Sequence, residues 1–177
     1  MSPCKRICCV VGIITLLALI MPDHLVFSQD DERTRTTLAG LKSIYLLIEP
    51  VDPEVEEKGL TTRQLRSDAE KKLRKAGIKL LSEEEYDRFK SVRSYPLARL
   101  EVITDVQEIK DTDLRVYNII VQIRQVVWLA RKPVVNLTGV TWKKQEFGYS
   151  RSLNVVRDKV KETVGQFITA YLAVNQK

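Results

Sequence analysis

The sequence predicts an α+β fold: a two-layer sandwich with two long helices packed on one face of a five-stranded, mixed, mostly antiparallel sheet. Three features predict it. Two helical stretches, 62–76 and 150–172, each carry an apolar stripe; two long stretches, 97–108 and 114–129, alternate apolar and polar residues; and short apolar runs at 44–48 and 78–81 flank the first helix. Helices with one apolar stripe and strands with one apolar face bury both by packing together in two layers.

The helix expected at 62–76 has the clearest local signals in the chain. Thr61 and Gln64 form a capping-box pattern, and Leu60 and Leu65 stand at the two hydrophobic-staple positions. Gly77 stands where a left-handed residue ends a helix. The apolar stripe consists of Leu65, Ala69, Leu73 and Ala76.

The remaining elements follow in chain order. The runs 44–48 and 78–81 flank this helix, so we expect two parallel strands with a right-handed crossover. Ser82 and Glu85 form a second capping box, which predicts a short helix to about Phe89. Ser150 or Ser152 caps the second long helix. Its stripe is Leu153, Val156, Val160, Val164, Phe167 and Tyr171.

The stretches 97–108 and 114–129 predict a hairpin with a defined register. Folding the chain at 110–113 pairs residues whose numbers sum to 223. The apolar faces of the two strands then coincide, whereas a slip of one residue would place apolar side chains opposite polar ones. The predicted pairs are Val106 with Tyr117, Thr104 with Ile119, Val102 with Val121 and Leu100 with Ile123. A third long strand, at 136–147, follows a turn at 131–133.

Residues 1–28 have the pattern of a signal peptide. Lys5 and Arg6 precede an apolar run at 7–21, and Val26 and Ser28 occupy positions −3 and −1 of a cleavage site after Ser28. The apolar run spans roughly 22 Å as a helix, which is short for a bilayer core of about 30 Å. We therefore expect cleavage and export to the periplasm or the medium, and an uncleaved membrane anchor is the alternative.

This division leaves a flexible N-terminal segment at 29–40 and a single α+β domain at 41–177. The three cysteines, Cys4, Cys8 and Cys9, and the only histidine, His24, all lie in the predicted signal peptide. A mature domain without them has no Ser-His-Asp triad or Cys-His dyad and none of the usual zinc ligands. The sequence also lacks phosphate-binding glycine motifs, so we expect no cofactor and no metal. The net charge of +6 is spread over both signs, which does not predict nucleic-acid binding.

The candidate binding site lies on the polar side of the long strands, which is not uniformly polar. Ile103 falls opposite Ile120 in the predicted register, and Arg124, Val126 and Trp128 continue the same face. Tryptophan and arginine are enriched at interaction hot spots. The alternative is that a loop or the N-terminal segment covers the tryptophan. Trp142 is left out because the turn near Pro133 does not fix its register.

Three stretches resemble a family of uncharacterised exported bacterial proteins. They are LRSDAEKKLRKAGIKLLSEEE at 65–85, YNIIVQIRQVVWLAR at 117–131 and FITAYLAVN at 167–175. The β-α-β opening is similar, more loosely, to the N-terminal domain of TolB-type periplasmic proteins. The first resemblance implies a bacterial, periplasmic or secreted protein, and the second implies protein contacts rather than catalysis. Neither assigns functional residues.

These observations favour a non-enzymatic module that binds another envelope protein. The first alternative is a small-ligand carrier with a pocket between helices and sheet, and the second is a carboxylate-based enzyme. A large cavity under the helices would favour the carrier, and an apolar patch on the open sheet face would favour the binding module. Two close carboxyl groups with a raised pKa would favour the enzyme. Contact with a membrane is expected only through an uncleaved signal segment, and the sequence makes no prediction of oligomeric state.

Overall fold

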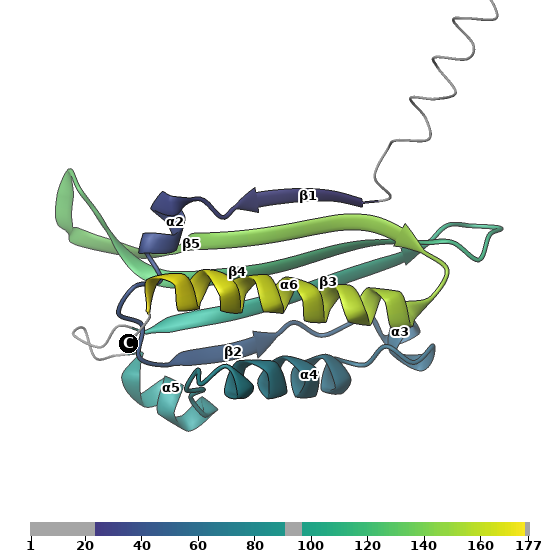
Figure 1. The fold of residues 1–177 in the computed structure, drawn as a ribbon, viewed down its shortest axis with the longest axis horizontal. Helices are drawn as coiled ribbons and strands as arrows, with labels where there is room; N and C mark the ends of the chain where they lie inside the picture. Colours follow the sequence, from purple (N-terminus) through teal and green to yellow (C-terminus); the bar gives the residue numbers. More distant parts are fainter. Residues whose placement is uncertain (1–23, 91–96, 176–177) are drawn as a thin grey trace, which may run out of the picture.

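The computed structural model describes residues 24–90 and 97–175 and has an α+β fold. Two layers make up the described part: a mixed sheet, and helices that cover one of its faces (Figure 1). The strands are β1 (His24–Gln29), β2 (Ile44–Ile48), β3 (Ala98–Glu108), β4 (Arg115–Leu129) and β5 (Lys132–Ser150). The helices are α2 (Glu32–Thr36), α3 (Pro53–Glu57), α4 (Thr62–Lys75), α5 (Glu83–Phe89) and α6 (Leu153–Val174).

The sheet has the strand order β1-β5-β4-β3-β2. Strands β2 and β3 are parallel, and the other neighbours are antiparallel. Helix α6 crosses β4 and β5, and α4 lies beside α6 against β2 (Figure 1). The predicted α+β class with a mixed sheet is therefore confirmed, and the long helices share one face of that sheet.

The five strands of the sheet differ from the predicted set in one member. The run 78–81 forms no strand, because only Leu80 makes a bridge, which is parallel, to Ile44. At the opposite edge, β1 pairs with β5 over residues that the sequence assigned to the end of the signal peptide. Residues 1–23 of that predicted segment lie outside the described residues.

The hairpin register derived from the sequence is confirmed. Val106 faces Tyr117, Thr104 faces Ile119, and the remaining pairs follow the same sum. Asp111, in the turn, has a φ of 62°, a left-handed conformation that aspartate tolerates better than most residues. The alternation of apolar and polar residues thus fixes which side chains of β3 and β4 face the helices.

Both long helices form where the sequence predicts them. Thr61 and Gln64 complete the capping box of α4, and Gly77 follows it with a φ of 77°. Helix α6 differs at its start, because the Ser152 side chain makes no cap. Instead the Ser150 hydroxyl accepts the Ser152 N–H at 3.0 Å. The short helix α5 has the predicted Ser82 capping box.

The segment 29–40, expected to be flexible, contains helix α2 and is bonded to the domain. The Asp30 carboxylate accepts two hydrogen bonds from Arg35 and one, at 3.0 Å, from Trp142 Nε1. The Arg35 hydrogen bond holds the pKa of Asp30 below its usual value against the opposing effect of burial. Leu38, just after α2, is fully buried in the core. These contacts come from single side chains, so residues 29–37 show no apolar periodicity from which they could be predicted.

Trp142 lies in the core and is not part of the open face. A register shift in the β4–β5 pairing falls between Ile123 and Arg124, so that Trp142 pairs with Ile123 and Val140 with Arg124. This irregularity turns the indole toward α6, where its ring meets Phe167 edge-on at 5.3 Å. The core between sheet and helices is therefore filled by large side chains.

Candidate functional site on the open sheet face and the hairpin arm

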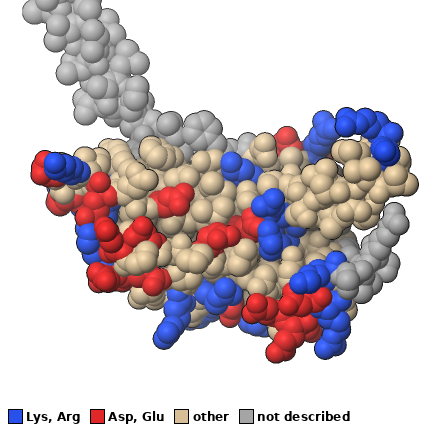
Figure 2. Space-filling view, turned by 180° about the vertical axis from the view of Figure 1, so that it is seen from behind, with Lys and Arg blue, Asp and Glu red and all other residues tan. Residues whose placement is uncertain are grey.

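The face of the sheet opposite the helices, here called the open face, carries alternate side chains of the long strands. Figure 2 shows this face, with red and blue side chains across its middle and a tan end at the right, where the β4–β5 hairpin projects. The side chains concerned are Arg99, Glu101, Ile103 and Asp105 of β3, and Asn118, Ile120, Gln122, Arg124, Val126 and Trp128 of β4.

The structure brings the five predicted site residues onto this one face but not into one cluster. Ile103 and Ile120 are directly paired, as predicted, and both are half-buried. Arg124 lies four residues further along β4 from Ile120 and is also half-buried. Val126 and Trp128 are 44% and 42% exposed. The tryptophan is thus partly accessible to solvent.

The far end of the β4–β5 hairpin, residues 125–140, is here called the hairpin arm. It projects beyond the body of the sheet (Figure 1). The two charged residues in the arm, Arg131 and Lys132, are both basic. Six of the eleven large apolar side chains that are exposed in the described residues belong to this arm. They are Val126, Trp128, Val134, Val135, Leu137 and Val140.

Next to the arm, a carboxylate lies between two guanidinium groups. Glu101 is 3% exposed and forms ion pairs with Arg99 and, at 3.7 Å, with Arg124. Gln122 Nε2 donates a hydrogen bond to the same carboxylate at 2.6 Å. A buried charge needs such partners. The Nε atoms of Arg99 and Arg124 are also buried, but neither has a hydrogen-bond partner among the described residues.

A small pocket of about 130 Å³ opens beside these arginines. Tyr45, Arg99 and Arg124 occupy one row across β2, β3 and β4. The ring of Tyr86, from α5, stacks on Tyr45 with the ring centroids 4.2 Å apart, and Tyr86 lines the pocket. The lining residues are Tyr86, Leu97, Arg99, Arg124, Gln125, Val126 and Thr138. The pocket therefore joins a cationic row to the apolar start of the hairpin arm.

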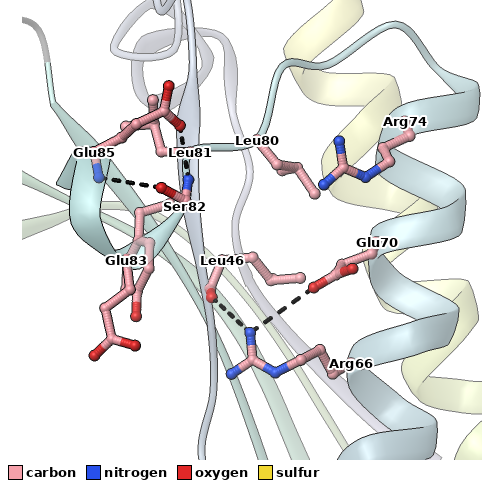
Figure 3. Close-up of a pocket in the computed structure, with 10 residues that line it drawn as sticks. Leu46, Arg66, Glu70, Arg74, Leu80, Leu81, Ser82, Glu83 and Glu85 are labelled. Atoms are coloured by element: carbon pink, nitrogen blue, oxygen red, sulfur yellow. Dashed lines mark hydrogen bonds and ion pairs between the residues drawn. The ribbon is translucent and has the colours of Figure 1, made fainter.

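A second, larger groove of about 420 Å³ lies between α4, the edge strand β2 and the start of α5. Figure 3 shows Arg66, Glu70 and Arg74 projecting from α4 toward β2, with Glu83 and Glu85 on the opposite side. Arg66 already bonds the Leu46 carbonyl at 3.3 Å and Glu70 at 3.9 Å. Five of the ten lining residues are charged, and the groove lies at the edge of the sheet and not between helices and sheet, where the sequence places the pocket of a small-ligand carrier.

The described residues provide no observation that favours catalysis. No three of their His, Cys, Asp and Glu side chains group closely enough to hold a metal ion. The carboxyl groups with a displaced pKa all have it lowered by hydrogen bonds to their neighbours, with none raised as a general acid would require. They are Asp30, Asp31, Glu56, Asp68 and Glu108. In the same part of the chain, no helix is both long and apolar enough to cross a bilayer.

Sequence reasoning missed Arg99, Glu101 and Gln122, although the signal was present. The register that pairs Ile103 with Ile120 also pairs Arg99 with Arg124 and Glu101 with Gln122. The predicted hairpin register, in which the numbers of paired residues sum to 223, therefore already placed a carboxylate next to two arginines on one face of the sheet. The apolar residues beyond Pro133 were missed because the register shift and the long hairpin cannot be derived from alternation alone.

No protein-family model and no curated protein matches the chain. Two similar solved structures are PelC dodecamers from Paraburkholderia phytofirmans. A single-substitution variant in space group C2 is 18% identical, with a TM-score of 0.47 over 80% of this chain and 94% of the PelC chain. The other, in space group P6, is 13% identical, with a TM-score of 0.43 over 87% of this chain and 99% of the PelC chain. Likeness at this level says nothing about function, and it does not bear on the resemblances seen in the sequence.

Proposed function

We propose that this chain is an exported, non-enzymatic module of the bacterial envelope that binds another protein through the hairpin arm and the adjoining open face. The observation that carries the proposal is the concentration of exposed apolar side chains on the arm. Soluble monomers seldom expose contiguous apolar surface without a use for it. Export is inferred from the signal-peptide pattern at 1–28.

The surroundings of the arm support a contact surface. Val126 and Trp128 project from the same face as Arg124, so an aromatic, an aliphatic and a cationic side chain are available to one partner. Tryptophan and arginine contribute most where they become fully desolvated at an interface. The core behind this face is filled by Trp142, Phe167 and their neighbours, which favours an external contact over an internal ligand.

Two matched substitutions test the proposal. Val126 and Val155 are 44% and 43% exposed, but Val155 lies on α6 at the opposite layer of the molecule. The tagged protein would be isolated from its own envelope fraction as the parent, Val126→Ser and Val155→Ser, after circular dichroism has shown that all three are folded. We expect the principal co-isolated protein to be lost with Val126→Ser and retained with Val155→Ser.

Trp128→Ser provides a second variant of the arm and is expected to behave like Val126→Ser. The proposal fails if both folded arm variants retain every protein that the parent binds. It also fails if Val155→Ser loses the same protein to the same extent, because the effect would then not belong to the arm.

A second candidate function, a carrier of a small polar ligand, rests on the groove beside α4. Its volume of about 420 Å³ is within the usual range for small-molecule sites. Native mass spectrometry of the protein isolated from cells distinguishes the two functions. The binding module is expected to carry no small molecule, whereas a ligand lost on Arg74→Ala would favour the carrier.

A further inference from the structure

Positive charge exceeds negative charge around Arg99 and Arg124, which lie side by side on β3 and β4. Glu101 neutralises one of the two guanidinium groups, and its neighbours across the sheet, Gln122 and Lys143, add an amide and a further cation on the next row. The nearest other carboxylate on this face of β3, Asp105, lies four residues beyond Glu101. The site around Arg99 and Arg124 is thus electropositive, because the single Glu101 carboxylate neutralises only one of the two guanidinium charges.

We propose that Arg99 and Arg124 form an anion subsite that binds a carboxylate group of the partner protein. The proposal rests on the protein-binding function and names the chemistry that the open face would recognise. The carboxylate enters the small pocket, receives hydrogen bonds from both guanidinium groups and leaves its own chain running over Val126.

The geometry prepares both arginines for this ligand. Both side chains line the pocket and are only about one-third exposed, at 29% and 35%, and their buried Nε atoms have no hydrogen-bond partner among the described residues, so neither guanidinium group has its full set of hydrogen bonds. The Glu101 ion pairs hold both side chains on the open face. An incoming carboxylate gains charge-assisted hydrogen bonds, which are stronger than neutral ones, without ordering either guanidinium anew.

The pocket favours a monoanion over a phosphate dianion. The two guanidinium groups and the Glu101 carboxylate that pairs with them leave a residual charge of about +1, which a single carboxylate balances, and Lys143, on the next row, does not line the pocket. A dianion would add repulsion from the Glu101 carboxylate at the same site. The volume of about 130 Å³ and the apolar side chains of Leu97 and Val126 also suit a carboxylate attached to an aliphatic residue.

Two sources of such a carboxylate are possible on a protein, a C-terminus and an acidic side chain. N-acetyl-leucine represents the first and N-acetyl-aspartate N-methylamide the second. N-acetyl-leucinamide is the neutral control, and inorganic phosphate is the dianion. The ¹⁵N-labelled protein is purified with its N-terminus as the cells process it. Each compound is then titrated into this protein while the arginine Nε–H signals are followed by NMR.

We expect saturable shifts of the Arg99 and Arg124 Nε–H signals with at least one carboxylate, on the order of millimolar affinity for so small a ligand. The neutral amide should produce no such shifts, and phosphate should bind more weakly than the better carboxylate. The tighter of the two carboxylates identifies the source. Affinity should fall as salt is raised, because the site is open to solvent.

Three variants make the assignment specific. Arg124→Gln should weaken carboxylate binding about tenfold or more, since it removes one charged donor group. Glu101→Gln should strengthen binding several-fold, since it removes the competing carboxylate. Arg63→Gln, at an exposed position on α4, should leave the affinity unchanged. Circular dichroism checks each fold, and Arg124→Gln alone is sufficient if Glu101→Gln does not fold.

The subsite is refuted if no carboxylate produces saturable shifts, if the neutral amide shifts the same signals equally, or if Arg124→Gln binds as the parent does. These outcomes are separate from the test of the proposed function. If the protein binds a carboxylate but Val126→Ser still captures the partner, the anion subsite is supported and the hairpin arm is refuted as the contact surface. If the partner is lost with Val126→Ser but no carboxylate binds, the hairpin arm is supported as the contact surface and the anion subsite is refuted.

Discussion

At the scale of single residues, Gly148 is required by its neighbour across the sheet. It pairs with Tyr117 of β4, and a Cβ added at Gly148 would lie 2.5 Å from the Tyr117 hydroxyl oxygen. Because Tyr117 is buried, its ring has little room to move. We expect Gly148→Ala to lower the free energy of unfolding by about 1–3 kcal/mol, as overpacking usually does, measured by urea denaturation.

The matched control is Gly165→Ala in α6. An added Cβ there would meet only Lys72 Nζ, at 3.5 Å, and alanine is favoured over glycine in a helix by about 1 kcal/mol. This variant should be as stable as the parent or more stable. Equal destabilisation by the two substitutions would show that the Tyr117 contact is not what requires glycine at position 148.

Leu73 tests the packing of α4 in the same way. It is fully buried on the stripe that faces the sheet and α6. Leu73→Ala should cost about 2–5 kcal/mol, the usual range for a core truncation. Lys71, two residues earlier on the opposite side of the helix and exposed, provides the control, because Lys71→Ala should be nearly neutral. If chemical denaturation gives similar losses for both, the helix is packed by a different face.

At the scale of elements, one ion pair joins the two long helices. Arg157 of α6 donates to both oxygens of Asp68 of α4, at 2.6 and 3.0 Å. The Arg157 hydrogen bond holds the pKa of Asp68 below its ordinary value of 3.8. A lowered folded-state pKa means that this pair stabilises the fold fully above about pH 4–5 and is lost as the pH falls through the folded pKa.

We therefore expect Asp68→Asn to be less stable than the parent at pH 7 by up to about 1 kcal/mol, because the pair is partly exposed. The difference should narrow below about pH 4, where the parent also loses its charge. Asp158→Asn, whose carboxylate forms an exposed ion pair with Lys161 three residues on in α6 and interacts with Arg157 only through its charge, should differ from the parent much less at pH 7. A difference for Asp68→Asn that stays constant down to pH 2 would contradict the assigned role of this carboxylate.

Elements with strong periodicity could be predicted from the sequence, and isolated contacts could not. Helix α4 and the β3–β4 register follow from caps, stripes and alternation, which act locally. Helix α2 has a local capping box of Asp31 and Thr34, but its attachment to the domain involves Asp30 bonding to Trp142, far along the chain, and the position of Trp142 depends on a register shift. For the candidate site, the sequence predicted the open face and Arg124. The exposed hairpin arm could not be predicted, because the length of the β4–β5 hairpin is known only from the structure.

At the scale of the whole molecule, the predicted export and the sheet edge are coupled. Cleavage after Ser28 would remove five of the six residues of β1 and leave β5 as an edge strand. We expect mass spectrometry of the exported protein to find an N-terminus near Gln29. Hydrogen exchange should then be faster at the β5 amides that pair with β1 than in the uncleaved chain. Retention of Met1 to Met21 would instead indicate a membrane anchor and an intact β1–β5 edge.

Photo-crosslinking in living cells can show whether the hairpin arm is the surface that contacts a partner protein. A photoreactive amino acid is placed at Val126 in one variant and at Val155 in another, since the two positions are almost equally exposed on opposite layers. We expect a discrete crosslinked protein adduct from position 126 and none from position 155. Adducts from position 155 alone, or from neither position in the folded and exported protein, would contradict it.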